Sequence, residues 1–314
     1  MKPSFRFSDF ILASLLVVGL MGAVGCRRTT SFTVEQSGLE AWYPLDESRP
    51  DPDSLAGLRV TLQADWVRES PYGRDVAGRI NARLLDALCG MIYGDSEVGE
   101  DEALVKVASE PMAVPEAGGT DISAEPTLGQ SLADTILSRY PLAKAGFNDW
   151  MQALVARYLS EYRQDLAGFA AEIAAGRFSP NAAAYEMECN QLLEVESGEA
   201  LVWKTFLYVY TGGAHGMQTV QYLNIDPKTG EEITLDRLFK PEMRDTVRDR
   251  VRAKLASGVY GNEIFDMAAV ELPAQFRLGG DSIVFQYQVY EIAPYVSGPI
   301  AVSLAKAELA DCLR

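Results

Sequence analysis

The chain contains one histidine, His215, and few other residues whose spacing suggests chemistry. A zinc site of the HExxH type needs more than one imidazole ligand, so this class is excluded. The sequence has no GxSxG nucleophile elbow, and no P-loop or GxGxxG turn precedes a helix. A Ser-His-Asp triad would need His215 as its base, and two carboxylates could serve a glycosidase. Spacing identifies neither set, so we expect no enzyme, no metal site and no cofactor.

The histidine lies in a glycine-bounded bend, residues 210–216 (YTGGAHG). Gly212 and Gly213 follow a strand-like run, where the backbone must turn sharply or lie close to another segment. Two interpretations of His215 stay open. Either its ring hydrogen-bonds the turn and fixes its shape, or it contacts a ligand or acts as a pH-sensitive element.

A second group of candidate binding residues, Tyr290, Pro294 and Tyr295, brackets the predicted exit of a strand. Proline stops strand pairing, so Pro294 would present two aromatic side chains near the sheet edge. Tyrosines are favoured anchors in protein interfaces because they bury area and keep a hydroxyl. The alternative is that Tyr290 packs in the core and Pro294 only forms a turn.

The elements that must position these residues begin in an N-terminal α+β part, residues 55–195. Apolar and polar residues alternate from Leu58 to Ala64, which predicts a half-buried strand within 55–67. Residues 76–88 have apolar side chains at helical spacing. Acidic, Pro and Gly residues mark 96–130 as a long surface loop, and 131–176 is mostly helical with an aromatic stripe typical of a core face.

The C-terminal part, residues 196–314, is predicted to consist mainly of strands. After a strand at 183–195 that ends the N-terminal part, we predict strands at 201–210, 218–225, 276–278, 283–291 and 300–304, with helices at 235–239, 241–255 and 305–312. Runs of strands around a block of helices predict an α+β fold with an antiparallel sheet packed against helices.

The N-terminus predicts export. A short apolar run, residues 10–20, follows Lys2 and Arg6, and it is about half the roughly 20 residues that a spanning helix needs. The sequence Ala23-Val24-Gly25-Cys26 then matches a bacterial lipobox. We therefore expect a signal peptide over 1–25, lipidation of Cys26, and a tether over 26–54 between the lipid and the folded part.

Composition restricts the partners. The formal net charge of −16 disfavours nucleic acid, which needs basic patches, and would attract a basic protein. Cys89, Cys189 and Cys312 have no CxxC spacing, so no redox or zinc motif is indicated. One disulfide is permitted outside the cytoplasm, but the sequence does not select a pair.

The segment 210–216 also begins a resemblance to the extracellular domain of the anti-sigma factor RsiV, a domain found beside peptidoglycan deacetylases as well. Matching blocks continue through 224–226, 229–230, Leu235, Leu238, Phe239, 276–278, 283–285, 290–295 and Gly298. The resemblance implies an antiparallel sheet packed on helices and a binding surface, which in RsiV binds lysozyme. We expect no cytoplasmic segment that would hold a sigma factor and no deacetylase domain, so only the recognition domain is expected to carry over.

Together these features predict a non-enzymatic lipoprotein of the cell envelope, on the outer membrane or the periplasmic side, held by its lipid alone. Its ligand would be a basic, lysozyme-like muramidase or a cell-wall glycan. Two alternatives stay open: a scaffold that recruits an envelope enzyme, and a carboxylate-based cell-wall hydrolase.

Overall fold

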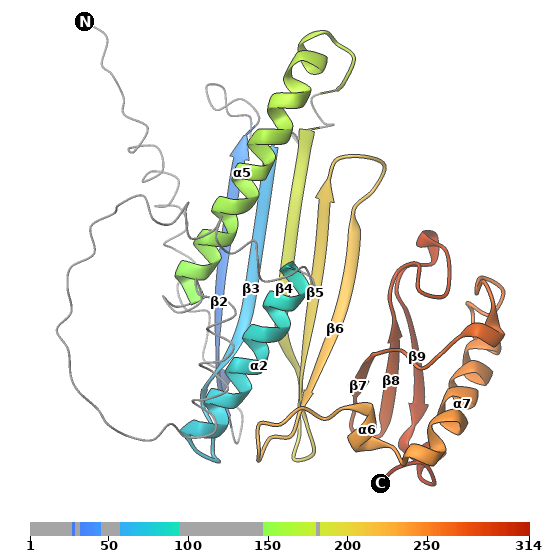
Figure 1. Ribbon diagram of the computed structural model, residues 1–314. Coiled ribbons are helices and arrows are strands. Elements are labelled where there is room, and N and C mark those ends of the chain that lie inside the picture. Colours follow the sequence, from blue (N-terminus) through green and yellow to red (C-terminus); the bar gives the residue numbers. More distant parts are fainter. Residues whose placement is uncertain (1–26, 29–31, 45–56, 94–146, 180–182) are drawn as a thin grey trace, which may run out of the picture. The chain divides into compact units, whose positions relative to one another are not determined.

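The computed structural model describes residues 27–28, 32–44, 57–93, 147–179 and 183–314 (Figure 1). The chain forms two compact units. The first contains the described residues up to Met187 together with Thr211–Gly213, and the second contains Glu188–Tyr210 and Ala214–Arg314. The predicted signal peptide, Cys26 and the predicted loop 96–130 lie outside the described residues, as do positions 131–146 of the predicted helical segment.

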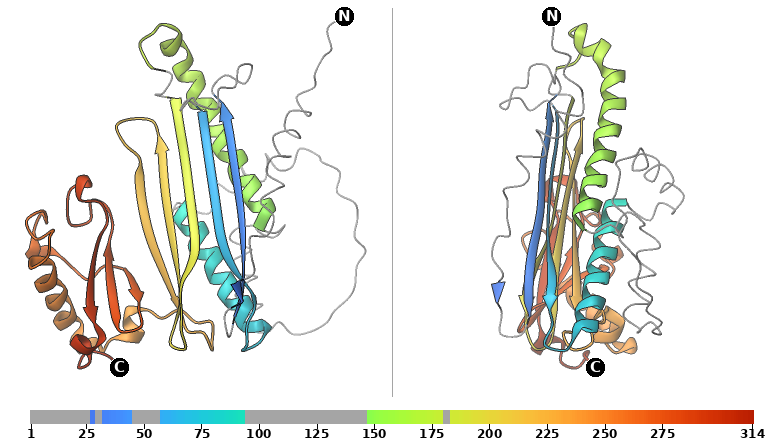
Figure 2. Two further views of the ribbon diagram at one scale, coloured as in Figure 1. Left: turned by 180° about the vertical axis from the view of Figure 1, so that it is seen from behind. Right: turned by 90° about the vertical axis from the view of Figure 1, so that its left-hand side faces the viewer.

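A long antiparallel hairpin with two helices on one face forms the first unit. Strand β2 (Thr33–Pro44) pairs with β3 (Gly57–Glu69), and helices α2 (Arg74–Tyr93) and α5 (Phe147–Ala174) cover one face of this hairpin (Figures 1 and 2). Alternate residues of β3 are buried, as a half-buried strand requires: Leu58, Val60, Leu62 and Ala64. The strand and the helix predicted over 55–67 and 76–88 are therefore confirmed.

The prediction of a tether over 26–54 is wrong for part of that range. Strand β1 (Arg27–Arg28) pairs with the start of β2, and β2 pairs with β3 along twelve residues. The buried residues Val34 and Leu39 lie five positions apart. This spacing gives no period-two signal, so the strand could not be recognised from alternation.

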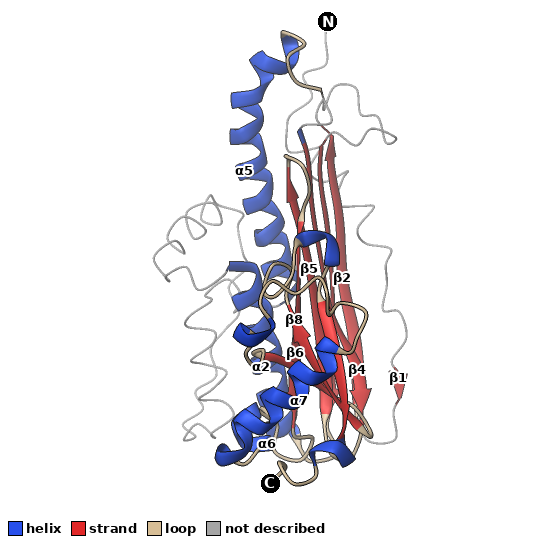
Figure 3. Cartoon of the chain, turned by 90° about the vertical axis from the view of Figure 1, so that its right-hand side faces the viewer, coloured by secondary structure: helices blue, strands red, loops and turns tan. Residues whose placement is uncertain are grey.

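Two sheets are present in the described residues (Figure 3). The larger is mixed; it consists of the short β1 and five long strands in the order β1-β2-β3-β4-β5-β6. Its further strands are β4 (Ala184–Glu196), β5 (Leu201–Thr211) and β6 (Met217–Ile225). The smaller sheet is antiparallel and consists of β7 (Gln275–Leu278), β8 (Ser282–Tyr287) and β9 (Ile300–Ala305). The predicted α+β class is confirmed.

The second unit has its core between the small sheet and α7 (Arg244–Ala256). Pro241 opens a 3₁₀ turn, η4 (Pro241–Met243), that leads into α7, after the short α6 (Leu235–Leu238). Val247, Val251 and Leu255 recur at four-residue steps on α7 and are buried against residues of β7, β8 and β9. The last predicted helix is a 3₁₀ turn, η7 (Lys306–Leu309).

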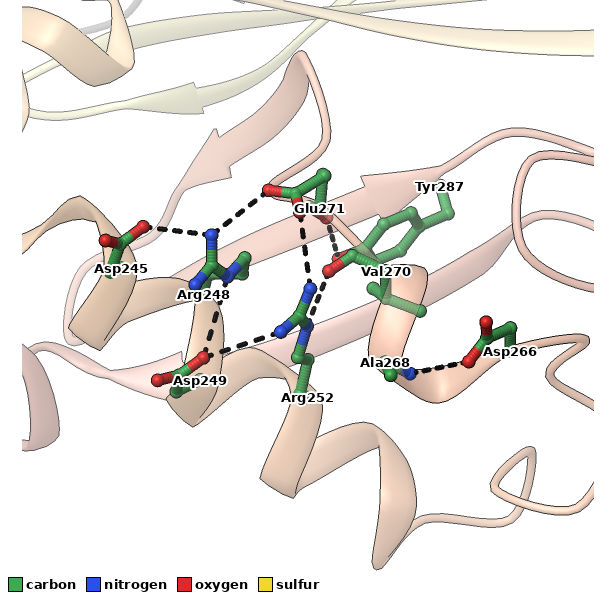
Figure 4. A network of polar contacts seen from close by, with 9 residues as sticks. All are labelled: Asp245, Arg248, Asp249, Arg252, Asp266, Ala268, Val270, Glu271 and Tyr287. Atoms are coloured by element: carbon green, nitrogen blue, oxygen red, sulfur yellow. Dashed lines mark hydrogen bonds and ion pairs between the residues drawn. The ribbon is translucent and has the colours of Figure 1, made fainter.

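A network of charged side chains holds the segment between α7 and β7 onto α7 (Figure 4). Arg252 Nε donates to the Val270 carbonyl at 2.6 Å, and its guanidinium lies 3.3 Å from the Glu271 carboxylate. Arg248 contacts Glu271 and Asp245, at 3.4 and 2.9 Å. These arginines are therefore paired within the unit.

Two further features bear on the predictions. In the described part of the chain, no helix combines the length and the apolar character that crossing a bilayer requires. Cys89, Cys189 and Cys312 are buried thiols, and burial raises the pKa of Cys189 to about 12.

Candidate functional site

The predicted site residues from two distant parts of the sequence meet in the second unit. The His215 ring stacks on the Tyr295 ring, with centroids 3.8 Å apart and an angle of 22° between the planes. The ring centroid of Tyr290 lies 5.6 Å from that of Tyr295. We call His215, Tyr290 and Tyr295 the aromatic cluster.

One backbone carbonyl, that of Gly216, contacts two members of the aromatic cluster. The Tyr295 hydroxyl donates to Gly216 O at 2.8 Å, and His215 Nδ1 lies 3.1 Å from the same oxygen. Because a carbonyl only accepts hydrogen bonds, this contact needs the proton on Nδ1. His215 therefore does hydrogen-bond the turn, as one of its two interpretations held, while its ring is exposed.

Gly216 lies against the Tyr208 ring, a close approach that the sequence did not show. A Cβ at this position would lie 2.5 Å from the Tyr208 ring of β5. The ring thus occupies the space of the missing side chain and holds the carbonyl that receives Tyr295 and His215. Gly212 and Gly213 need glycine for another reason, since their φ angles are 85° and 91°.

The segment that carries the two tyrosines departs from the predicted strand. We predicted a strand over 283–291, but β8 ends at Tyr287. Tyr290 has φ 66°, a backbone conformation that non-glycine residues rarely adopt, and this ends the extended chain. Pro294 then precedes the 3₁₀ turn η6 (Tyr295–Ser297), so it begins a turn and does not terminate a strand.

Amide side chains join this segment to β6. Gln288 Nε2 donates to Val220 O at 2.6 Å, and its Oε1 accepts from Val220 N at 2.9 Å. In the same way Gln275 Oε1 accepts from Tyr222 N at 2.8 Å. Asn224 of β6 reaches back, donating to Phe276 O at 2.7 Å and accepting from Leu278 N at 2.8 Å. Side chains thus satisfy β6 backbone groups where a further strand would otherwise pair.

The arrangement exposes aromatic surface. Tyr290 is 50% exposed, although the alternative interpretation placed it in the core. The nearby hydroxyl of Ser297 donates to the Glu263 carboxylate at 2.6 Å. Among the described residues, no group of three or more His, Cys, Asp or Glu side chains is placed to hold a metal ion. Stacked and half-exposed rings are suited to binding a protein or a sugar ring.

Comparison with known proteins finds a match to one protein family. The family described as "Protein of unknown function (DUF3298)" matches residues 236–306. The chain carries a DUF3298 domain. The matched residues include Tyr290, Pro294 and Tyr295, whereas His215 precedes them.

The chain is similar to solved structures of DUF3298 proteins. One from Bacteroides fragilis has a TM-score of 0.61 at 18% identity, covering 91% of this chain and 96% of that chain. Another, from Pseudomonas aeruginosa PAO1, has a TM-score of 0.48 at 13% identity, covering 92% and 97%. No curated protein matches the chain. The Bacteroides structure thus supports the two-sheet α+β fold.

Proposed function

We propose that this chain is a lipid-anchored protein of the cell envelope whose DUF3298 unit binds an extracytoplasmic ligand without catalysing a reaction. The ligand is a basic, lysozyme-like muramidase or a cell-wall glycan. The resemblance to the RsiV domain supports this, and so does the strongly acidic charge of −16.

One observation carries the proposal: the rings of the aromatic cluster are held in place by contacts within the unit, and they are still accessible to solvent. The Tyr295 hydroxyl and the His215 ring are both held by Gly216 O, so the rings are preorganised before any ligand arrives. Tyr290 stands beside them, half-exposed, on a strained backbone. Strained residues persist where the surrounding structure fixes them, and they cluster at binding sites.

Calorimetric titration tests the proposal. A soluble form that begins directly after the proposed lipidated cysteine, residues 27–314, is titrated with a basic lysozyme near physiological salt, and in parallel with soluble muropeptides. We expect a one-to-one complex with one of them that survives higher salt, since binding by long-range charge alone would be screened.

Matched aromatic variants then locate the site. Tyr290→Ala should weaken the complex at least tenfold, whereas Tyr72→Ala, in the first unit, should leave it unchanged. Tyr72 is a matched control because its side chain is 47% exposed, close to the 50% of Tyr290. Equal affinity of the wild type and Tyr290→Ala would reject the aromatic cluster as the site.

The lipid anchor has its own test. Cells that express the full chain with Cys26 should incorporate labelled palmitate into it, and Cys26→Ser should not. Label that persists in Cys26→Ser would refute the proposed anchor.

A further inference from the structure

The small sheet of the second unit ends in an edge strand. Strand β9 (Ile300–Ala305) is the last in the order β7-β8-β9, and among the described residues it pairs with β8 alone (Figure 1). An edge strand presents backbone N–H and C=O groups that can pair with a further strand, and most proteins protect such edges. The groups on the free side of β9 therefore decide what could pair there.

The hydrogen bonds at the end of β9 show which of its backbone groups face outward. Lys306 N donates to Asp281 O at 2.7 Å, so position 306 bonds to the β8 side. Hydrogen-bonded and non-hydrogen-bonded positions alternate along an antiparallel pair, and Ala305 is therefore turned away from β8. Its N–H donates instead to the Glu308 carboxylate at 2.8 Å. By the same alternation, every second residue of β9 directs its N–H and C=O groups to the free side.

Two residues in the middle of β9, Ala301 and Ser303, therefore present open backbone groups. Within the part of the chain that the structure describes, no group donates to their outward C=O or accepts from their outward N–H. Their side chains are small and exposed, as is that of Ala305, whereas the alternate residues of β9 are buried in the core with α7. No bulky side chain of β9 itself covers this edge.

The edge of β6 in the same unit differs from that of β9. Along β6, the side chains of Gln275 and Gln288 bond to backbone groups of Tyr222 and Val220, at 2.6 to 2.9 Å. In β9 only the outer N–H, that of Ala305, is occupied in this way. The strand also contains no charged residue and no proline, the residues that commonly prevent edge pairing. The edge of β9 is therefore suited to accept a strand.

The sequence of β9 is self-complementary about Ser303. When two copies of β9 run antiparallel with Ser303 on the two-fold axis, the two serines exchange both backbone bonds, and Ala301 N reaches the Ala305 carbonyl of the second copy. Two serine hydroxyls then meet on one face, between alanines. On the other face, Val302 lies across from Leu304 of the second copy, an apolar cross-strand pair. Within the paired strands no charged side chain opposes another.

We propose that the chain forms a symmetric dimer by antiparallel pairing of β9 with β9 of a second copy, which joins the two small sheets into one continuous sheet. The net charge of −16 opposes self-association, but two charges that flank the edge are paired within the unit. Lys306 bonds to Glu199 at 2.6 Å, and Arg250 to Asp311 at 2.7 Å. Charges separated by more than about 8 Å are largely screened at physiological salt. The dimer uses neither the aromatic cluster nor the lipid, so it is independent of the proposed function.

Analytical ultracentrifugation of the soluble form, residues 27–314, tests the pairing. We expect a dimer that forms as the protein concentration rises. Ser303→Lys should raise its dissociation constant at least tenfold, because two ammonium groups would meet on the axis. Thr219→Lys, at an exposed position of β6, is the matched control and should leave the dimer unchanged. Both positions are exposed, so circular dichroism and the unfolding midpoint of the monomer should be the same in all three proteins.

Cysteine variants test the register. Ser303→Cys places two thiols on the axis with their Cα atoms about 5.5 Å apart, which is within disulfide range. It should form a disulfide-linked dimer under mild oxidation. Ala301→Cys should not, because its two thiols would lie about four residues apart along the strands, or about 13 Å. The native thiols Cys89, Cys189 and Cys312 are buried, so the wild type should not cross-link either.

Four other outcomes would overturn the dimer. A wild type that stays monomeric at all concentrations has no such pairing, and a dimer that survives Ser303→Lys uses another surface. A cross-link in Ala301→Cys and not in Ser303→Cys would show a different register. A monomer whose Ala301 and Ser303 amides resist hydrogen exchange would assign the edge to another segment of the same chain. None of these results changes the interpretation of the ligand titrations.

Discussion

Helix α7 and the loops that carry Phe265 and Val296 belong to the same unit, yet their side chains differ in what they contact. On α7, Arg248 and Arg252 are matched by Glu271 and by acidic residues of the helix itself (Figure 4). In the loops, Phe265 and Val296 are exposed, although each lies beside buried residues.

This difference separates a surface that stabilises the fold from one that is available to a partner. The α7 charges have their counter-charges and backbone carbonyls within the unit, so an added partner would gain little from them. The exposed apolar side chains of Phe265 and Val296 would gain favourable burial in a complex. Substitutions on α7 should therefore change stability and leave binding intact.

The largest loss of stability is expected where the aromatic cluster is joined to β6. Gln288→Leu removes both hydrogen bonds to Val220 and leaves a buried N–H and carbonyl unsatisfied. We expect the free energy of unfolding to fall by about 2–4 kcal/mol, measured by urea denaturation. Thr219→Val, on an exposed neighbour, should change it by less than about 0.5 kcal/mol. A neutral Gln288→Leu would show that water replaces the amide.

A somewhat smaller loss is expected from Gly216→Ala, because the added Cβ would lie 2.5 Å from the Tyr208 ring. Overpacking of this kind costs about 1–3 kcal/mol, and it should also displace the carbonyl that holds Tyr295. Urea denaturation of the single variants and of Gly216→Ala with Tyr208→Ala gives the coupling between them. If Tyr208→Ala does not relieve part of the Gly216→Ala loss, the packing explanation fails.

The sequence predicted those elements whose signal is local. Alternation located β3, and helical spacing located α2, because burial on one face imposes a period. β2 was missed because Val34 and Leu39 do not share that period. The end of β8 was misplaced because Val289 is apolar and buried, so the alternation continues beyond Tyr287, the last residue of the strand.

The candidate site was predictable in its residues and not in its geometry. The resemblance singled out His215, Tyr290 and Tyr295, but their stacking depends on a carbonyl of Gly216 that is distant in sequence from the tyrosines. Phe265 could not be recognised as exposed, because an apolar residue next to a turn has the same local sequence signal whether it enters the core or faces solvent.

The α7 side of the comparison is tested by Arg252→Met, which keeps the alkyl stem and removes the guanidinium. It loses the bond to Val270 O and the ion pair with Glu271, so unfolding should become easier by about 1–2 kcal/mol, while lysozyme affinity should not change. Arg244→Met is the matched control on the same helix. Its pair with Asp236 is exposed, and it should cost at most about 0.5 kcal/mol. Reduced lysozyme affinity in Arg252→Met would break the proposed division between the two surfaces.

The smallest effect is expected at Asp311, which makes two hydrogen bonds with Arg250 of α7, at 2.7 and 2.8 Å. The Arg250 guanidinium lowers the pKa of Asp311 below the ordinary value of about 3.9. A carboxyl with a lowered pKa in the folded state stabilises it above that ordinary value and loses this contribution as the pH falls further. The melting temperature of the wild type should therefore fall more steeply below about pH 4 than that of Asp311→Asn. Because the pair is exposed, added salt should reduce the difference. Equal slopes in the two proteins would contradict this contribution, because the bond from Lys240 Nζ to the Asp311 backbone carbonyl is the same in both.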